Sequence, residues 1–203
     1  MNDLYTAVVH DVKNQLAELA LRLGKRGDAP QEMKIAMNAA RRLSEMLMVH
    51  RQATDLLRIN IVTVNPADFL GILAAEYREL FPEISIHIDA EQAPDCVFID
   101  DALVRMAVGN ALHNACRHAH KDIRISAFEE DGMLVLEVLD DGPGYPESML
   151  ALGGEAPAAA SDSGTGLGLY LARKIAELHQ LNGRHGSVEL SNAPGGRFRM
   201  KLP

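Results

Sequence analysis

Apolar positions in the first part of the chain recur at helical spacing. Steps of four and three residues alternate along one heptad seam, the pattern of helices that pack against other helices; its members are Tyr5, Val9, Val12, Leu16, Leu19 and Leu23. The stretch GKRGDAP, residues 24–30, interrupts the seam with two glycines and a proline. A second helical pattern has Ala36, Ala40, Leu43 and Leu47 along one side. Residues 1–59 are therefore predicted to form an antiparallel helical hairpin.

This hairpin carries more apolar residues than two helices can cover. Leu, Met and Val crowd the segment LSEMLMVH, residues 43–50, beyond a single stripe. Pairing two hairpins into a four-helix bundle would bury the surplus. We therefore expect a homodimer.

The pattern changes after Ile59. The segment EISIHID alternates Ile84, Ile86 and Ile88, which predicts a strand with one buried face. Residues 101–119 and 166–179 have helical patterns, and residues 122–128 and 133–140 read as two strands joined by a hairpin turn. Residues 187–202 look like a closing hairpin, and residues 151–164 form a long stretch of small residues without a pattern. Interleaved strands and helices predict an α+β sandwich over residues 60–203.

Composition narrows the classes of function. The chain has 203 residues and a net charge of −8, which argues against a nucleic-acid binder because such a protein needs a basic face. Cys96 and Cys116, the two cysteines, lack the spacing of a metal site or a disulfide framework. No apolar run reaches the length of a membrane span, and the start of the chain lacks a signal-peptide pattern. A cytoplasmic location is expected.

Three polar segments of the second region carry candidate chemistry. In GNALHNACRHAH, residues 109–120, Asn110 and Asn114 share one helix face, with Arg117 one turn further. Asparagine is a mediocre choice within a helix, whereas its amide oxygen suits hydrated Mg²⁺ and neighbouring phosphates. A polar helix surface is the alternative interpretation.

The second segment is LDDGPGY, residues 139–145. Asp140 closes an apolar strand, and Gly142 and Gly144 belong to a tight turn. A carboxylate at this position can accept a hydrogen bond from an exocyclic amine, and glycines let a flat ring approach the backbone. A plain turn fits the same residues.

The third segment is SGTGLGL, residues 163–169. Gly164, Gly166 and Gly168 lead directly into a helix, whose first N–H groups and dipole favour a phosphate. The segment has neither the dinucleotide-binding spacing nor the Gly-Lys-Ser/Thr of a P-loop.

Together with VVHDVKNQL, residues 8–16, these segments resemble the histidine protein kinases of two-component signalling, within the wider ATPase group that includes gyrase and MutL. VVHDVKNQL looks like the H box, and the three later segments look like the N, G1 and G2 boxes. Their order matches the family, and the resemblance covers nearly the whole chain. It implies a dimerisation and phosphotransfer hairpin over residues 1–59, followed by a GHKL or Bergerat-type α/β sandwich ATP-binding domain over residues 60–203.

The resemblance also implies roles in binding ATP and Mg²⁺. Asn114 matches the Mg²⁺ ligand, Asn110 lies one turn earlier, and Arg117 matches a basic residue that contacts phosphates. His118 stands where an aromatic residue is common, near the adenine or ribose. Asp140 matches the aspartate that recognises the adenine amine, with Gly142 and Gly144 shaping the pocket. The G2 box supplies the phosphate side of the site; it comprises Gly164, Thr165, Gly166, Leu167 and Gly168, and residues 151–163 would be the ATP lid.

In the H box, the resemblance implies that His10 accepts the phosphoryl group and Asp11 acts as its general base. Asn14 stands where related kinases orient water to dephosphorylate their partner. The expected partner is a response-regulator receiver domain, with no nucleic acid. The chain is either a cytoplasmic protein or the cytosolic portion of a larger or membrane-associated sensor.

Two features depart from the family. Gln15 occupies a place where many H boxes have proline, and no aromatic F box is recognisable between the G1 and G2 boxes. Two other functions stay open. A phosphotransfer protein would relay phosphate through His10 without ATP, and an anti-sigma-type protein of the same ATPase fold would sequester partners. Degenerate nucleotide motifs would mark the former, and here they look intact.

Overall fold

The computed structural model describes residues 2–53, 59–152, 167–192 and 194–203. The chain divides into two compact units, residues 1–58 and 59–203. The boundary predicted from the sequence lies one residue later, after residue 59. Among the described residues, no helix is long and apolar enough to cross a membrane.

The first unit is a helical hairpin of α1, Asn2–Arg26, and α2, Pro30–Ala53. The first helix continues through Gly24, so the expected interruption begins three residues too early. Lys25 and Arg26 suit the last turn because cations interact favourably with the negative end of the helix dipole. Gly27 then takes a φ of 70° and donates its N–H to the carbonyl of Leu23, 3.1 Å away, which ends the helix.

The heptad seam of α1 is covered on one side only. Leu16 and Leu23 are half-buried and Ala20 is buried, whereas Val12 and Leu19 are 41% and 47% exposed. The expectation that Val12 faces inward is therefore wrong for the hairpin of one chain. The apolar positions of a heptad form two rows, one on each side of the line of contact between helices. Helix α2 covers the row of Leu16 and Leu23 and leaves the row of Val12 and Leu19 exposed.

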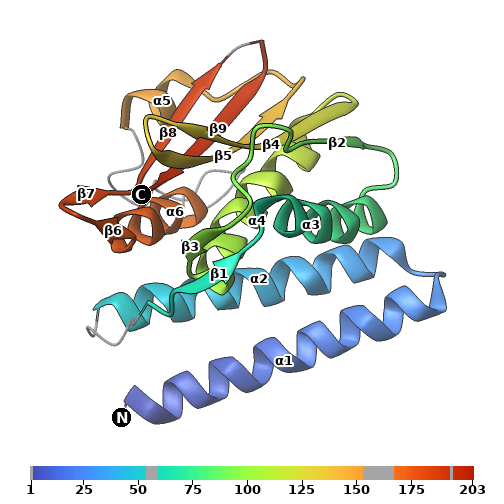
Figure 1. Ribbon diagram of the computed structural model, residues 1–203. Helices are drawn as coiled ribbons and strands as arrows, with labels where there is room; N and C mark the ends of the chain where they lie inside the picture. The colour runs from blue at the N-terminus through green and yellow to red at the C-terminus, as the bar shows by residue number, and fades with distance from the viewer. Residues whose placement is uncertain (1, 54–58, 153–166, 193) are drawn as a thin grey trace. The chain divides into compact units, whose positions relative to one another are not determined.

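The second unit is built on a five-stranded sheet with the order β2-β4-β5-β9-β8. Strand β2 runs parallel to β4, and every other neighbouring pair is antiparallel. In Figure 1 the longer helices of this unit gather on one face of the sheet. The α+β class predicted from the sequence is confirmed. The strands are β2, Ser85–Asp89; β4, Asp122–Glu130; β5, Met133–Asp140; β8, Ser187–Asn192; and β9, Gly196–Leu202.

The core lies between this sheet and the helices α3, Pro66–Leu80; α4, Asp101–His118; and α6, Leu167–Leu178. Inward residues of the strands alternate with outward ones, as in a sheet with one covered face. The side chains that the structure buries almost completely include Leu70, Leu73, Leu112, Ile125, Leu136, Ile175 and Met200. In edge strand β2, however, Ile88 is 39% exposed, so only Ile84 and Ile86 follow the predicted buried stripe.

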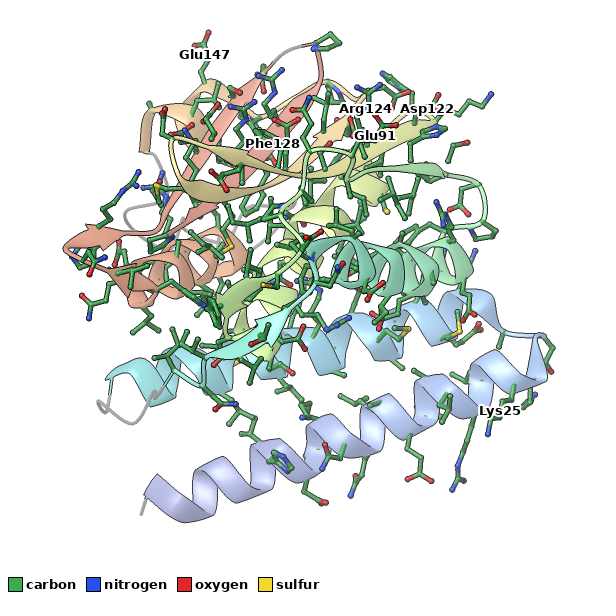
Figure 2. All side chains as sticks on the ribbon, viewed as in Figure 1. Lys25, Glu91, Asp122, Arg124, Phe128 and Glu147 are labelled. Atoms are coloured by element: carbon green, nitrogen blue, oxygen red, sulfur yellow. The ribbon has the colours of Figure 1, made fainter. Side chains whose placement is uncertain are left out.

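The opposite face of the sheet carries ion pairs between side chains of different strands. Glu137 on β5 lies 2.6 Å from Arg199 and 3.8 Å from Arg197, both on β9. Lys201 on β9 bridges Glu130 on β4 and Glu189 on β8. This is the face of β4 that carries Arg124 and Phe128, which Figure 2 labels. The guanidinium of Arg199 lies over the Phe128 ring, 5.6 Å from its centroid.

Several elements have no counterpart in the sequence analysis. These are α3; the two-stranded pairs of β1, Val62–Val64, with β3, Val97–Ile99, and of β6, Gln180–Leu181, with β7, Arg184–His185; and α5, Glu147–Leu152. Signals for α3 were present, because Asn65 caps it by accepting the Asp68 N–H and Pro66 opens its first turn.

Two buried polar residues fix the start of α4. The carboxylate of Asp100 caps the helix through the Leu103 N–H and accepts a second bond from the Asn60 N–H. Nε2 of the buried His179 accepts the Asp100 N–H at 3.0 Å, while its Nδ1 donates to the carbonyl of Ile175 at 2.8 Å. The end of α6 is thereby tied to the helix that carries the N box.

Candidate functional site

Helix α4 presents the N box in its second half. Asn110 is buried, with an exposed fraction of 3%, whereas Asn114, Arg117 and His118 are exposed. The two asparagines are four residues apart and therefore share a face. Asn114 lies on the same face of the helix as Asn110, but its side chain is exposed to solvent.

Asp140 ends β5 and is 92% buried, with its carboxylate held from two directions. Its Oδ1 accepts the N–H of Gly142 at 2.8 Å and the N–H of Gly196 at 3.1 Å. A Cβ built on Gly196 would lie 2.6 Å from Oδ2, so any larger residue would cover that oxygen. The fold thus fixes the carboxylate through Oδ1, while the glycine at position 196 keeps a side chain away from Oδ2.

The turn after Asp140 packs tightly against the end of α4. A Cβ on Gly142 would lie 2.9 Å from the carbonyl carbon of His118, a separation that real Cβ atoms essentially never show. Gly144 has a φ of 80°, which favours glycine. Both glycines that the sequence singled out in this segment are therefore required by the backbone, and they bring the G1 box against the N-box helix.

Asp141 fastens the same turn to the loop before β4. Its carboxylate accepts the backbone N–H groups of His120, Lys121 and Asp122 at 2.8 to 3.1 Å. Burial opposes its ionisation, but these amide bonds outweigh burial and hold the pKa of Asp141 below its usual value. The residue beside Asp140 is therefore ionised at neutral pH and structural in its contacts.

Tyr145 follows Gly144 at the end of the same turn. Burial, followed by the nearby charge of Asp140, raises the pKa of its hydroxyl. Its backbone N–H and carbonyl are both bonded to the side chain of Asn192, the last residue of β8. A neutral phenol and a carboxylate thus line one region of the site.

The last part of the G2 box joins the N box. Helix α6 begins at Leu167, and a Cβ on Gly168 would lie 3.5 Å from both Cβ and Nδ2 of Asn110, which places this glycine directly beside the buried asparagine. Gly164, Thr165 and Gly166 lie outside the described residues, as does the predicted lid from residue 153 onward.

The H box lies in the first unit, on the exposed side of α1. The side-chain amide of Asn14 lies 3.2 Å from Nδ1 of His10, one helical turn away. The carboxylate of Asp11 accepts a hydrogen bond from Gln15 at 2.9 Å. All four side chains are exposed.

The structure therefore brings the N box, the G1 box and the start of α6 together within residues 59–203. It adds residues that sequence reasoning missed, namely Asp141, Tyr145, Asn192, Gly195 and Gly196. The glycine pair in NAPGGR was a visible signal for a close backbone approach, because a Cβ on Gly195 would lie 2.7 Å from the carbonyl carbon of Asp140. Nothing in the sequence connected this pair with Asp140, 55 positions earlier.

The donor set suits a nucleotide and a hard cation. A carboxylate at a strand end next to glycines is suited to accept an exocyclic amine, and the exposed amide oxygen of Asn114 is a ligand that Mg²⁺ accepts together with waters and phosphates. Among the described residues, no group of three His, Cys, Asp or Glu side chains is arranged to hold a metal ion.

Comparison with known proteins gives matches of the same kind. The profile of the histidine kinase-, DNA gyrase B- and HSP90-like ATPase family matches residues 99–203. The sensor-type histidine kinase PrrB of Mycobacterium bovis is 30% identical over 149 residues, which are 70% of this chain and 32% of PrrB. The chain thus spans about a third of the length of that relative.

Solved structures agree on the fold. The ATP-binding domain of PrrB from Mycobacterium tuberculosis matches 70% of this chain and 96% of its own, with a TM-score of 0.56 and 26% identity. The histidine kinase AdeS of Acinetobacter baumannii matches 94% of each chain with a TM-score of 0.64 and 18% identity, a likeness of fold alone. The resemblance to histidine protein kinases is confirmed, and the chain belongs to the histidine kinase-, DNA gyrase B- and HSP90-like ATPase family.

Proposed function

We propose that the chain is the core of a two-component histidine kinase, which uses ATP to phosphorylate His10 and passes the phosphoryl group to an aspartate of a response-regulator receiver domain. The observation that carries the proposal is the convergence of the N box, the G1 box and the start of α6 around Asp140 and Asn110. The geometry of the described part of this site favours it over a phosphotransfer protein that does not use ATP.

In this proposal, Oδ2 of Asp140 accepts a hydrogen bond from the adenine amine. Asn114 holds Mg²⁺, which neutralises phosphate charge when bound, and Arg117 contacts the phosphates. His118 borders the adenine or ribose. The G2 residues bind the phosphates through backbone N–H groups near the start of α6; these are Gly164, Thr165, Gly166, Leu167 and Gly168. Phosphoryl transfer needs little covalent help, so positioning and charge neutralisation supply most of the catalysis.

At the acceptor, the side-chain amide of Asn14 contacts Nδ1 of the exposed His10, which makes Nε2 the ring nitrogen that we assign to the attack. Asp11 takes the proton from Nε2 of the neutral imidazole, the lone pair of Nε2 attacks the γ-phosphorus, and the bond to the ADP oxygen breaks. The same amide of Asn14 is suited to orient water for dephosphorylation of the partner. Unchanged dephosphorylation by an Asn14→Ala variant would count against that second role.

We also propose a homodimer through the hairpin. Apolar side chains remain exposed on both helices of one chain, which is the surplus that a second hairpin would bury; they include Val12, Leu19, Leu21, Ile35 and Met46. Sedimentation should give a dimer for the parent chain, and charged substitutions at Val12 and Leu19 together should give a monomer.

The proposal is tested by incubating the chain with γ-labelled ATP and Mg²⁺, beside His10→Gln and Asn114→Ala variants and a His185→Gln control. His185 is an exposed histidine on β7. Acid-labile, alkali-stable label is expected on the parent and the control, none on His10→Gln, and little on Asn114→Ala. Equal label on His10→Gln would refute the assigned acceptor. Absence of both label and ATP binding would favour the phosphotransfer protein.

A further inference from the structure

Asn192 makes an unusual pair of contacts with the G1 turn. Its Oδ1 accepts the backbone N–H of Tyr145 at 2.8 Å, and its Nδ2 donates to the carbonyl of the same residue at 2.9 Å. The asparagine side chain thus acts as a strand partner for a single residue. Both contacts are exposed, where water could satisfy the same backbone groups, so their main effect is to fix a position.

The backbone of the turn is fitted to this side chain. Gly144 precedes the bonded residue and has a φ of 80°. A Cβ at this glycine would lie 2.6 Å from Oδ1 and 2.9 Å from Nδ2 of Asn192. Gly144 therefore lies so close to Asn192 on β8 that a residue with a side chain would not fit at its position.

The two segments that Asn192 joins are the two that hold Asp140. Oδ1 of Asp140 accepts one bond from Gly142, in the G1 turn, and one from Gly196, at the start of β9. Asn192 is the partner of Gly196 in the register of β8 and β9. If the turn and the β8–β9 hairpin separated, the carboxylate could follow only one of its two amide donors, and Oδ2 would change its direction.

We propose that Asn192 is a positioning residue for base recognition: it locks the G1 turn to the β8–β9 hairpin and thereby directs Oδ2 of Asp140 toward the exocyclic amine of a purine. This inference rests on the proposed function, because it needs ATP as the ligand of this site. It assigns a role in nucleotide specificity to a residue outside the four sequence motifs.

The test measures the ratio of ATP to GTP affinity for the whole chain. Adenine presents an amine to Oδ2, whereas guanine presents a carbonyl oxygen, so a misdirected carboxylate weakens ATP binding without weakening GTP binding. For Asn192→Ala, the ratio should fall about tenfold, as expected when the one hydrogen bond between Oδ2 of Asp140 and the adenine amine is weakened. Asn192→Asp keeps the acceptor for the Tyr145 N–H, so its ratio of ATP to GTP affinity should fall by less.

Val188→Ala provides the matched control. Val188 is buried on the same strand, and its truncation destabilises β8 without touching Tyr145. It should lower the melting temperature and leave the ratio unchanged. An unaltered ratio in Asn192→Ala, with ATP preferred by the parent chain, would overturn this inference alone. Failure of the parent chain to bind ATP would overturn the proposed function as well.

Discussion

Gly142 lies directly against the backbone of His118, with space for a hydrogen atom and none for a methyl group. A Gly142→Ala substitution must push the G1 turn away from the end of α4 and disturb the Gly142–Asp140 hydrogen bond. We expect the free energy of unfolding to fall by about 1–3 kcal/mol, the usual cost of overpacking. ATP affinity should fall at least about tenfold, because Asp140 loses one of its amide donors. Urea denaturation and calorimetric titration measure these two effects.

Gly71 offers the contrasting case. It lies within α3, and a Cβ built there would meet no atom within 4 Å. Gly71→Ala should therefore raise the free energy of unfolding by about 0.5–1 kcal/mol, because alanine loses less backbone entropy in a helix. Its ATP affinity should equal that of the parent. A loss of stability would show that the glycine has a packing role that its surroundings do not reveal.

His179 should matter for stability far more than an exposed histidine. His179→Ala leaves the Asp100 N–H and the Ile175 carbonyl without their buried partner and opens a cavity at the end of α6. The free energy of unfolding should fall by about 2–4 kcal/mol. His87→Ala, at an exposed position on β2, should change it by less than about 0.5 kcal/mol. Equal effects in the two variants would contradict the assigned role.

Asp141 makes part of the stability dependent on pH. Its pKa is lowered in the folded state, so its contribution is fully present above the ordinary aspartate value of 3.8 and is lost as the pH falls through the lower folded value. Asp141→Asn should be less stable than the parent at neutral pH, and this difference should shrink on the acid side of 3.8. Urea midpoints across the pH range measure it; a difference that stays constant would exclude the carboxylate as its source.

The motifs were readable from the sequence because each depends on local chemistry. Asp140 at a strand end and Asn110 with Asn114 on one helix face follow from spacing alone. The environment of Asp140 was not readable in this way, because Gly196 and Asn192 reach it through the pairing of β8, β9 and β5, which brings distant residues together. Short pairs such as β6 with β7 carry too few residues to show a period. The burial of Val12 was predicted wrongly because a heptad pattern does not indicate which of its two rows of apolar side chains the second helix of the same chain covers.

Equilibrium binding tests most directly whether Asp140 recognises the base of ATP, as we propose. Calorimetric titration with ATP and Mg²⁺ should show one site on the parent chain. Asp140→Asn should bind at least about tenfold more weakly, because an amide nitrogen beside the base repels the adenine amine that a carboxylate oxygen accepts. Circular dichroism should show both proteins folded. Equal affinity for ATP in the two folded proteins would contradict the account.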